Sequence, residues 1–547
     1  MKTRFVLAAA AVLLHVAAAS HPTDAPSAED LRAATVGVVA FANSGAPRAQ
    51  ADFLYGLAQL HNFQYQDAAV AFRRAQEADP GFALAYWGEA MTNNHAVWMQ
   101  QDANAARAVL VRLAPDRAAR LAKAGTDRER AYLEAVEILY GDGDKFERDR
   151  LYAKAMQRLH ERWPDDVDAT AFYALALLGT AHAGRDVPTY MKAYALLEEP
   201  FRQYPQHPGV AHYLVHSVDD AAHAPLGLKA ARAYAKIAPE SPHALHMASH
   251  IYLALGLWDE VVAANENALA VGARRASQRG ARPPRCGHGH IWLNYGYLQQ
   301  GRYAAAKRLI ARCLAEMSGR SPINESGQFD PEDSAVGTFY TMRLRYLLDA
   351  PPDSEVLGWA PEPGPVLYAA FLRDYGAAIL AARRGAADQF GATAAQAAAS
   401  AARLHAEMDR LNIEPDSPYR RVLAIQVGQL DGARRLFTGD RVEGVSMLEA
   451  VASQEDALPA AFGPPQVDEP TRELLGAMLA PSDASKARLQ FERALVLNPG
   501  RVGPRRGLMQ AERKLGNTAA ADAIEADLEK TLKHADTGAA HAMRQEP

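Results

Sequence analysis

Cysteine is scarce in this chain of 547 residues, which holds only two, and neither stands in a CxxCH run. Covalent haem attachment is therefore excluded. The sequence also lacks a GxxxxGK[ST] loop, an HExxH run and a GxSxG elbow, so we expect no nucleotide cofactor, no helix-borne zinc protease and no hydrolase of the nucleophile-elbow type. The formal net charge is −5, with no prominent run of Lys or Arg. We therefore expect no nucleic-acid partner.

Long apolar runs are missing after the N-terminus. Lys2 and Arg4 precede an apolar stretch, Phe5 to Ala19, and small residues follow. This pattern predicts a signal peptide at residues 1–20, removed so that the mature chain starts at Ser20 or His21, followed by a flexible segment at 21–45. The mature chain would have no membrane span. We expect a soluble exported protein, most simply periplasmic.

A repeated pattern of small, aromatic and proline residues dominates the rest of the chain. It appears in Tyr55-Gly56 … Tyr65 … Ala68 … Phe72 … Ala75 … Pro80 and again in Ala487 … Phe491 … Ala494 … Pro499, and Pro205 and Pro239 are 34 residues apart. The pattern resembles the tetratricopeptide repeat family, a helix-turn-helix unit of about 34 residues. The resemblance implies an all-α solenoid of antiparallel helix pairs, in an exported bacterial member of that family, and says little about function.

Composition divides this array. Residues 46–317 form a first helical array, 318–365 an irregular region with a short helix near Thr338 to Leu348, 366–533 a second helical array, and 534–547 a disordered tail.

Histidines crowd one part of the first array. Nine of the eighteen lie between residues 207 and 290, namely His207, His212, His216, His223, His243, His246, His250, His288 and His290. The pairs His212/His216 and His246/His250 are spaced i,i+4, which puts both rings of each pair on one helix face.

The repeat register, taken from the family resemblance, turns these positions into directions. It places six histidines and Asp219 on the concave face of three consecutive first helices, where they face one groove: His212, His216, His243, His246, His250 and His288. Tyr295, Asp219 and His207 are candidates for the surrounding shell. His207, His223 and His290 otherwise take loop or flanking positions.

Several imidazoles in one groove favour a transition metal, with copper and zinc the leading candidates. The paired HxxxH elements resemble dinuclear copper proteins in spacing alone. Two alternatives stay open: a polar histidine layer that hydrogen-bonds across helices, and recognition of an acidic peptide.

The sequence thus predicts an exported solenoid that binds a transition metal, with copper-dependent oxidation or zinc-assisted hydrolysis as the activities such a site supports. The alternatives are a non-catalytic scaffold that binds an envelope protein, a peptide or a small molecule in its groove, and a metal storage or transfer protein. The same register brings Cys286 and Cys313 together at one end of a helix pair, so that a disulfide and two unrelated thiols are both open alternatives.

Overall fold

The computed structural model describes residues 35–537 apart from 284, 318–333 and 365. The predicted signal peptide, residues 21–34 of the flexible segment, residues 318–333 and 365 of the irregular region and residues 538–547 of the tail lie outside these residues. Within them, one antiparallel pair of two-residue strands, β1 (Asn94–His95) and β2 (Gln100–Gln101), accompanies 25 α-helices.

The N-terminal array, residues 46–317, comprises fifteen α-helices: α2 (Gln50–His61), α3 (Tyr65–Ala78), α4 (Ala83–Met91), α5 (Ala103–Leu113), α6 (Arg117–Leu121), α7 (Asp127–Leu139), α8 (Lys145–Arg162), α9 (Val167–Leu178), α10 (Val187–Gln203), α11 (Pro208–Ser217), α12 (Ala224–Ile237), α13 (Pro242–Ala254), α14 (Trp258–Gln278), α15 (His288–Gln299) and α16 (Tyr303–Ala315). The C-terminal array, residues 334–537, comprises ten: α17 (Ala335–Asp349), α18 (Ser354–Gly358), α19 (Leu367–Arg383), α20 (Ala387–Arg410), α21 (Pro418–Phe437), α22 (Arg441–Asp456), α23 (Thr471–Leu479), α24 (Ala484–Leu497), α25 (Val502–Lys514) and α26 (Thr518–Thr531).

Most successive helices pack against each other as hairpins, so the predicted fold class, an all-α solenoid of antiparallel helix pairs, is confirmed. Proline sets the ends of these helices: α3, α8, α10, α12 and α24 each end two residues before a proline of the repeat pattern. Close packing explains the small residues of the pattern. Phe72 lies between Gly56 and Gly88, where a Cβ would clash with its ring, and Phe491 lies in the same way against Gly476.

The irregular region has a helix where one was predicted, and this helix is longer than expected. Its helix, α17, is 15 residues long and almost wholly buried, and it packs against α15, α16 and α19. Because α17 fills the space between the arrays, the region joins them as part of the core.

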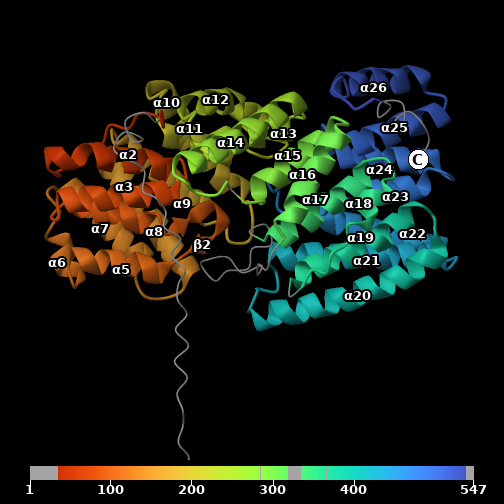
Figure 1. Ribbon diagram of the computed structural model, residues 1–547, viewed down its shortest axis with the longest axis horizontal. Helices are drawn as coiled ribbons and strands as arrows, with labels where there is room; N and C mark the ends of the chain where they lie inside the picture. The colour runs from red at the N-terminus through yellow and green to blue at the C-terminus, as the bar shows by residue number, and fades with distance from the viewer. Residues whose placement is uncertain (1–34, 284, 318–333, 365, 538–547) are drawn as a thin grey trace, which may run out of the picture.

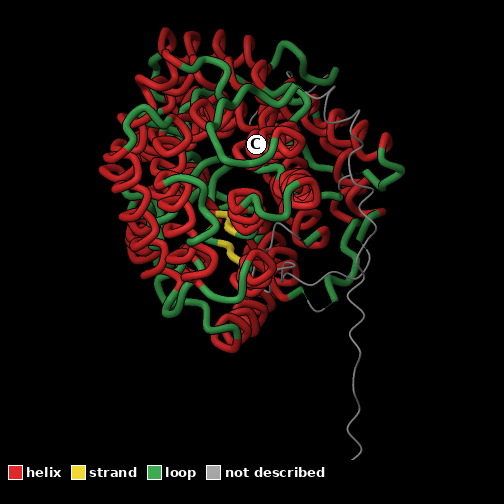
Figure 2. Tube along the Cα trace, turned by 90° about the vertical axis from the view of Figure 1, so that its left-hand side faces the viewer, coloured by secondary structure: helices red, strands yellow, loops and turns green. Residues whose placement is uncertain are grey.

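The chain runs from α2 at one end of the molecule to α26 at the other (Figure 1). Figure 2 shows the β1–β2 pair inside the surrounding helices. The two arrays touch directly: the indole N–H of Trp258 donates to the carbonyl of Gly500 at 2.9 Å. No helix in the described ranges is both long and apolar enough to span a membrane.

Candidate metal centre

Three consecutive first helices of the N-terminal array supply the candidate site. His212 comes from the middle of α11 and His216 from its last turn, His243, His246 and His250 come from α13, and His288 is the first residue of α15. Prolines in the first turns of α11 and α13 and a side-chain cap from Ser241 fix where these helices begin. These helix starts set where along each helix the histidines lie.

The rings fall into two groups of three. In the first histidine set (His212, His216 and His243), one ring nitrogen from each residue lies within 4.8 Å of the others, and the Nε2 atoms of His212 and His243 are 3.1 Å apart. In the second histidine set (His246, His250 and His288), Nε2 of His246 lies 3.3 Å from that of His250 and 3.1 Å from that of His288. The structure thus brings together all six predicted ligands.

These distances fit a shared ion. Nitrogens about 2.0–2.1 Å from a tetrahedral metal lie about 3.3 Å from one another. The Nε2 atom of His216 adds a second sign, because it is buried and has no hydrogen-bond partner. A buried polar atom without a partner is uncommon and suggests a missing ion or water.

Fixed acceptors hold the other ring nitrogen of four histidines. The Nδ1–H group of His212 donates to the carbonyl of His61 at 2.6 Å, and that of His246 donates to Oδ1 of Asn265 at 2.7 Å. His216 and His250 both donate from Nδ1 to Oδ2 of Asp219, at 3.2 and 2.8 Å. With the proton on Nδ1, each Nε2 is left as a lone-pair donor, which is the usual arrangement around metal-binding histidines.

Asp219 joins the two sets, because its partners belong one to each. Burial alone would raise the pKa of Asp219, but the Arg185 guanidinium and the two imidazole N–H groups hold it well below its usual range. The carboxylate is therefore charged. It fixes both rings without being available as a free base.

Four of the six imidazoles are kept neutral. Burial, reinforced by the neighbouring imidazoles, lowers the pKa of His212, His243 and His246 well below the usual value. Burial also lowers the pKa of His250 to about 4, although Asp219 opposes the shift. At neutral pH these rings are in the form that binds metals.

Aromatic rings surround the sets. Phe63 touches His212 edge-on with ring centroids 4.3 Å apart, and its backbone has a φ of +54°, a strained value for a residue with a side chain. Trp98 lies 5.8 Å from His243, and Trp292 stacks on His250 at 4.4 Å. Within this shell four of the six imidazoles are buried, those of His212, His216, His246 and His250.

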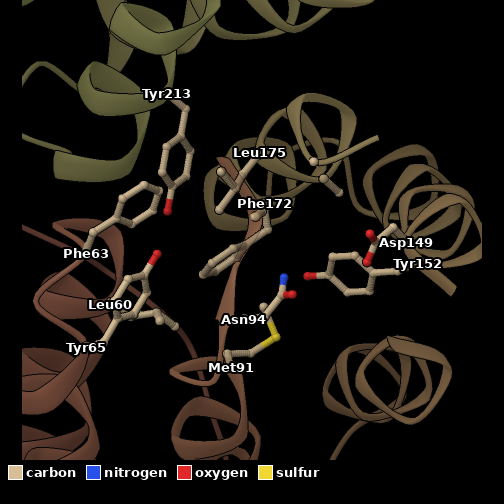
Figure 3. Close-up of a pocket in the computed structure, with 13 residues that line it drawn as sticks. Leu60, Phe63, Tyr65, Met91, Asn94, Asp149, Tyr152, Phe172, Leu175 and Tyr213 are labelled. Carbon is tan, nitrogen blue, oxygen red and sulfur yellow. The ribbon is translucent and has the colours of Figure 1, made fainter. Parts of the chain in front are cut away.

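A small, mostly apolar cavity lies behind Phe63 and Tyr213, between α2, α4, α9 and α11 (Figure 3). The hydroxyl of Tyr65 on its wall is buried without a hydrogen-bond partner, and burial raises the pKa of that phenol well above its usual value. Phe63 separates this cavity from the first histidine set.

A second polar cluster beside the site is already satisfied by hydrogen bonds. His61 and His207 both bond to Asp168 through Nε2, at 2.9 and 3.2 Å, and the Tyr213 hydroxyl bonds to Nδ1 of His61. The Nδ1 atom of His207 accepts the Val210 N–H and so caps α11. His207 therefore positions α11 and the His61 carbonyl from a distance, rather than touching the predicted ligands.

Tyr295 was wrongly included in the predicted shell. Its hydroxyl accepts a hydrogen bond from Arg501 at 3.1 Å, and its ring packs against Trp258. The ring turns toward the C-terminal array because a buried cation lies there. His223 bonds to Asp220, and burial lowers the pKa of His290 to about 4; neither belongs to a histidine set.

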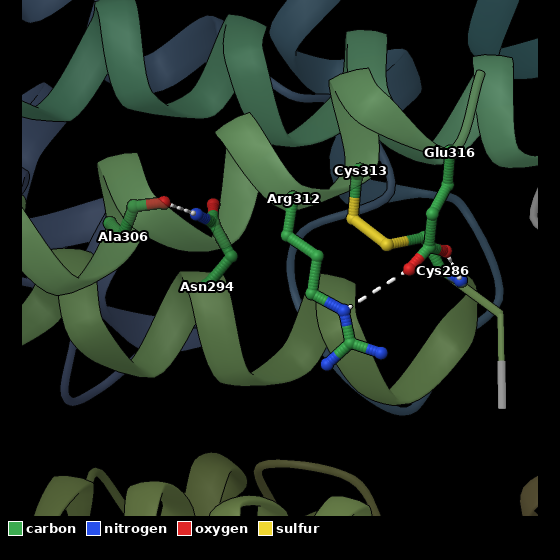
Figure 4. The surroundings of a disulfide bond; sticks show 6 residues. All are labelled: Cys286, Asn294, Ala306, Arg312, Cys313 and Glu316. Carbon is green, nitrogen blue, oxygen red and sulfur yellow. Dashed lines mark hydrogen bonds and ion pairs between the residues drawn. A yellow bond between two sulfur atoms is a disulfide. The ribbon is translucent and has the colours of Figure 1, made fainter. Parts of the chain in front are cut away.

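The two cysteines form a disulfide (Figure 4). Cys286 precedes α15 and Cys313 lies in the last turn of α16, so the bond ties the start of one helix to the end of its partner. The backbone N–H of Cys286 also donates to Glu316 at 2.9 Å. Together these contacts fix the chain two residues before His288.

Sequence reasoning missed the carbonyl of His61, Asn265, Phe63, Trp292 and the aromatic ring of Phe462. Asn265 lies on α14, the hairpin partner of α13, where the repeat register offers a signal. Trp292 lies on α15, one turn after His288. His61, Phe63 and Phe462 reach the site from remote segments, and no local pattern marks them.

Comparison with known proteins leaves the function open. No family model matches the sequence, and no curated protein matches it. Among solved structures, the human IFIT1 dimer with m7Gppp-AAAA is 12% identical over 90% of this chain and 91% of that one, with a TM-score of 0.35. Yeast Tom70 is 13% identical over 91% and 95%, with a TM-score of 0.25. At TM-scores this low, no ligand or partner of these proteins can be assigned to this chain. The expectation that it binds no nucleic acid therefore stays a prediction.

Proposed function

We propose that this protein binds a pair of copper ions, one in each histidine set. The observation that supports this most is the convergence of six imidazoles in two groups, with Nδ1 of four of them held by fixed acceptors. A layer of histidines that served only to hydrogen-bond would pair each N–H with an acceptor. Here Nε2 of His246 and Nε2 of His250, both left without a proton because Nδ1 donates elsewhere, face each other at 3.3 Å, and Nε2 of His216 faces no partner.

The charge balance favours copper over zinc. Imidazole suits both metals, but each set offers three neutral ligands. The carboxylate that touches both sets, Asp219, is already paired with Arg185. Cu(I) brings one positive charge to this buried site where Zn²⁺ brings two, and uncompensated buried charge is costly. Three ligands for each ion leave a coordination position open. Copper-dependent oxidation is the activity we infer, with zinc-assisted hydrolysis and metal storage as alternatives.

The fold by itself agrees better with another prediction, a non-catalytic interaction scaffold, because a solenoid with a groove is all that a scaffold requires. The copper proposal needs the six imidazoles as well. We also propose that the protein is exported and periplasmic, as the N-terminal pattern predicts; the disulfide agrees with an oxidising compartment.

Metal analysis of the full chain tests the proposal. Protein prepared with copper and zinc both supplied is expected to hold about two copper ions per chain, and the double variant His246→Ala/His250→Ala about one. His223→Ala, outside both sets, serves as the matched control and is expected to keep both ions. Absence of stoichiometric metal from the wild type, or no loss in the double variant, would leave the scaffold as the favoured function.

A further inference from the structure

A segment of the C-terminal array covers the candidate metal centre. Residues 457–470 connect α22 to α23, yet Phe462 in their middle lies on the N-terminal array. Its ring stacks on His250 with centroids 4.9 Å apart and lies 6.0 Å from His216. Because these two histidines belong to different sets, the ring lies across the junction of the two proposed ions.

Two close approaches press this segment onto the N-terminal array. Gly463, at a φ of +96°, passes so near Trp292 that a Cβ would lie 2.5 Å from the indole. Pro459 packs on Gly184, where a Cβ would lie 2.6 Å from the proline ring. Phe462 lies between these two contacts, those of Pro459 and Gly463, and its ring is held against the histidines.

The tip of the segment, residues 457–464, and its base, residues 465–470, are held differently. Near its base, Arg345 binds Asp468 at 2.8 Å and the carbonyl of Pro465 at 3.2 Å. Among the described hydrogen bonds and ion pairs, none joins residues 457–464 to the N-terminal array. The tip is held there by apolar contact alone. It can therefore lift while the base stays bound.

A phenylalanine ring has no atom that binds a metal, so Phe462 lies over one histidine of each set without supplying a ligand. It also marks a place where an aromatic ring fits, stacked on a metal-binding imidazole. A phenol is such a ring that also carries an oxygen able to bind copper. We propose that the tip, residues 457–464, is a removable cover and that Phe462 occupies the binding position of a small phenol. This inference rests on the proposed copper pair.

The test compares phenol binding in three forms of the copper-loaded full chain: wild type, Phe462→Ala and Leu458→Ala. Leu458 lies in the same segment but packs against Ile425 and Val451, away from the histidines. The probe is 4-nitrophenol, titrated by difference absorbance, with nitrobenzene as the ring without a hydroxyl. Metal content is measured in every sample by mass spectrometry.

Phe462→Ala is expected to bind 4-nitrophenol about tenfold more tightly or better, because the phenol no longer has to displace the Phe462 ring from the histidines. Leu458→Ala is expected to stay within about twofold of the wild type, and nitrobenzene is expected to bind at least tenfold more weakly than 4-nitrophenol. Hydrogen exchange in residues 457–464 should rise in Phe462→Ala with the helices unchanged.

Unchanged or weaker binding of 4-nitrophenol by a Phe462→Ala protein that keeps its copper would overturn the phenol position. Equal tightening in Leu458→Ala would show that loosening of the segment, not the ring's place, is responsible, and would overturn it too. If the proposal of a copper pair is itself wrong, the result is different: the wild type then lacks stoichiometric metal before any phenol is added.

Discussion

Asp219 is the residue on which the geometry of the candidate site depends most. It is 1% exposed, and one of its oxygens accepts N–H bonds from His216 and His250, while Arg185 neutralises the charge. One carboxylate thus sets the tautomer and orientation of one ring in each set. Such outer partners often matter to a metal nearly as much as its ligands do.

Replacing this carboxylate should weaken metal binding without removing a ligand. For Asp219→Asn we expect copper affinity to fall about 10- to 100-fold, because a neutral amide holds two imidazole N–H groups less well than a carboxylate. Competition with a chelator of known affinity measures the change. Asp220→Asn is the matched control: Asp220 also binds Arg185, but its histidine partner is His223, outside both sets. Equal losses in the two variants would contradict a special role for Asp219.

At the scale of the helix, the repeat register predicted much of the site. Pro205 and Pro239 fix the length of a repeat unit. That length assigns the i,i+4 histidine pairs of α11 and α13 to the concave face of the array, and His288 at the start of α15 to the same face. The fold class followed from the same pattern. Local spacing is enough here because a repeat converts position along the chain into direction in space.

The rest depended on contacts between segments far apart in the chain. The carbonyl of His61 meets His212 across 151 positions, and Phe462 comes from the other array. Tyr295 was misplaced because the register gives a face of α15 but not the buried cation, Arg501, toward which the ring turns. Tertiary packing determines such pairings, and a repeat pattern carries no information about contacts between distant segments.

The disulfide of the α15–α16 hairpin should support the second histidine set more than the first. It closes a loop of 27 residues and fixes the chain just before His288. For Cys286→Ser/Cys313→Ser we expect a loss of stability of about 2–4 kcal/mol and weaker binding of one ion of the pair. Thermal unfolding and a chelator titration measure the two effects. A variant that loses both ions equally would show that the bond supports the whole array instead.

At the scale of the molecule, the two arrays divide the work. All six imidazoles come from α11, α13 and α15 of the N-terminal array, whereas the cover over them comes from the C-terminal array. The arrays are joined by a buried charge cluster in which Arg501, 2% exposed, pairs with Asp349 at 3.0 Å and with Glu473, and donates to Tyr295 on α15. This cluster fixes the position of the C-terminal array against α15, and with it the position of the cover over the histidines.

Breaking the cluster should destabilise the junction and spare the metal. Arg501→Ala leaves two buried carboxylates without their cation, so we expect a loss of about 3–5 kcal/mol and faster hydrogen exchange in α23 and α25. Copper content should stay unchanged, because no ligand belongs to that array. Arg505→Ala is the matched control: its partner Asp527 is 63% exposed, and loss of that pair should cost about 1 kcal/mol or less. Loss of copper in Arg501→Ala, but not in Arg505→Ala, would mean that the C-terminal array holds α15 in its metal-binding position and that the division between ligands and cover is wrong.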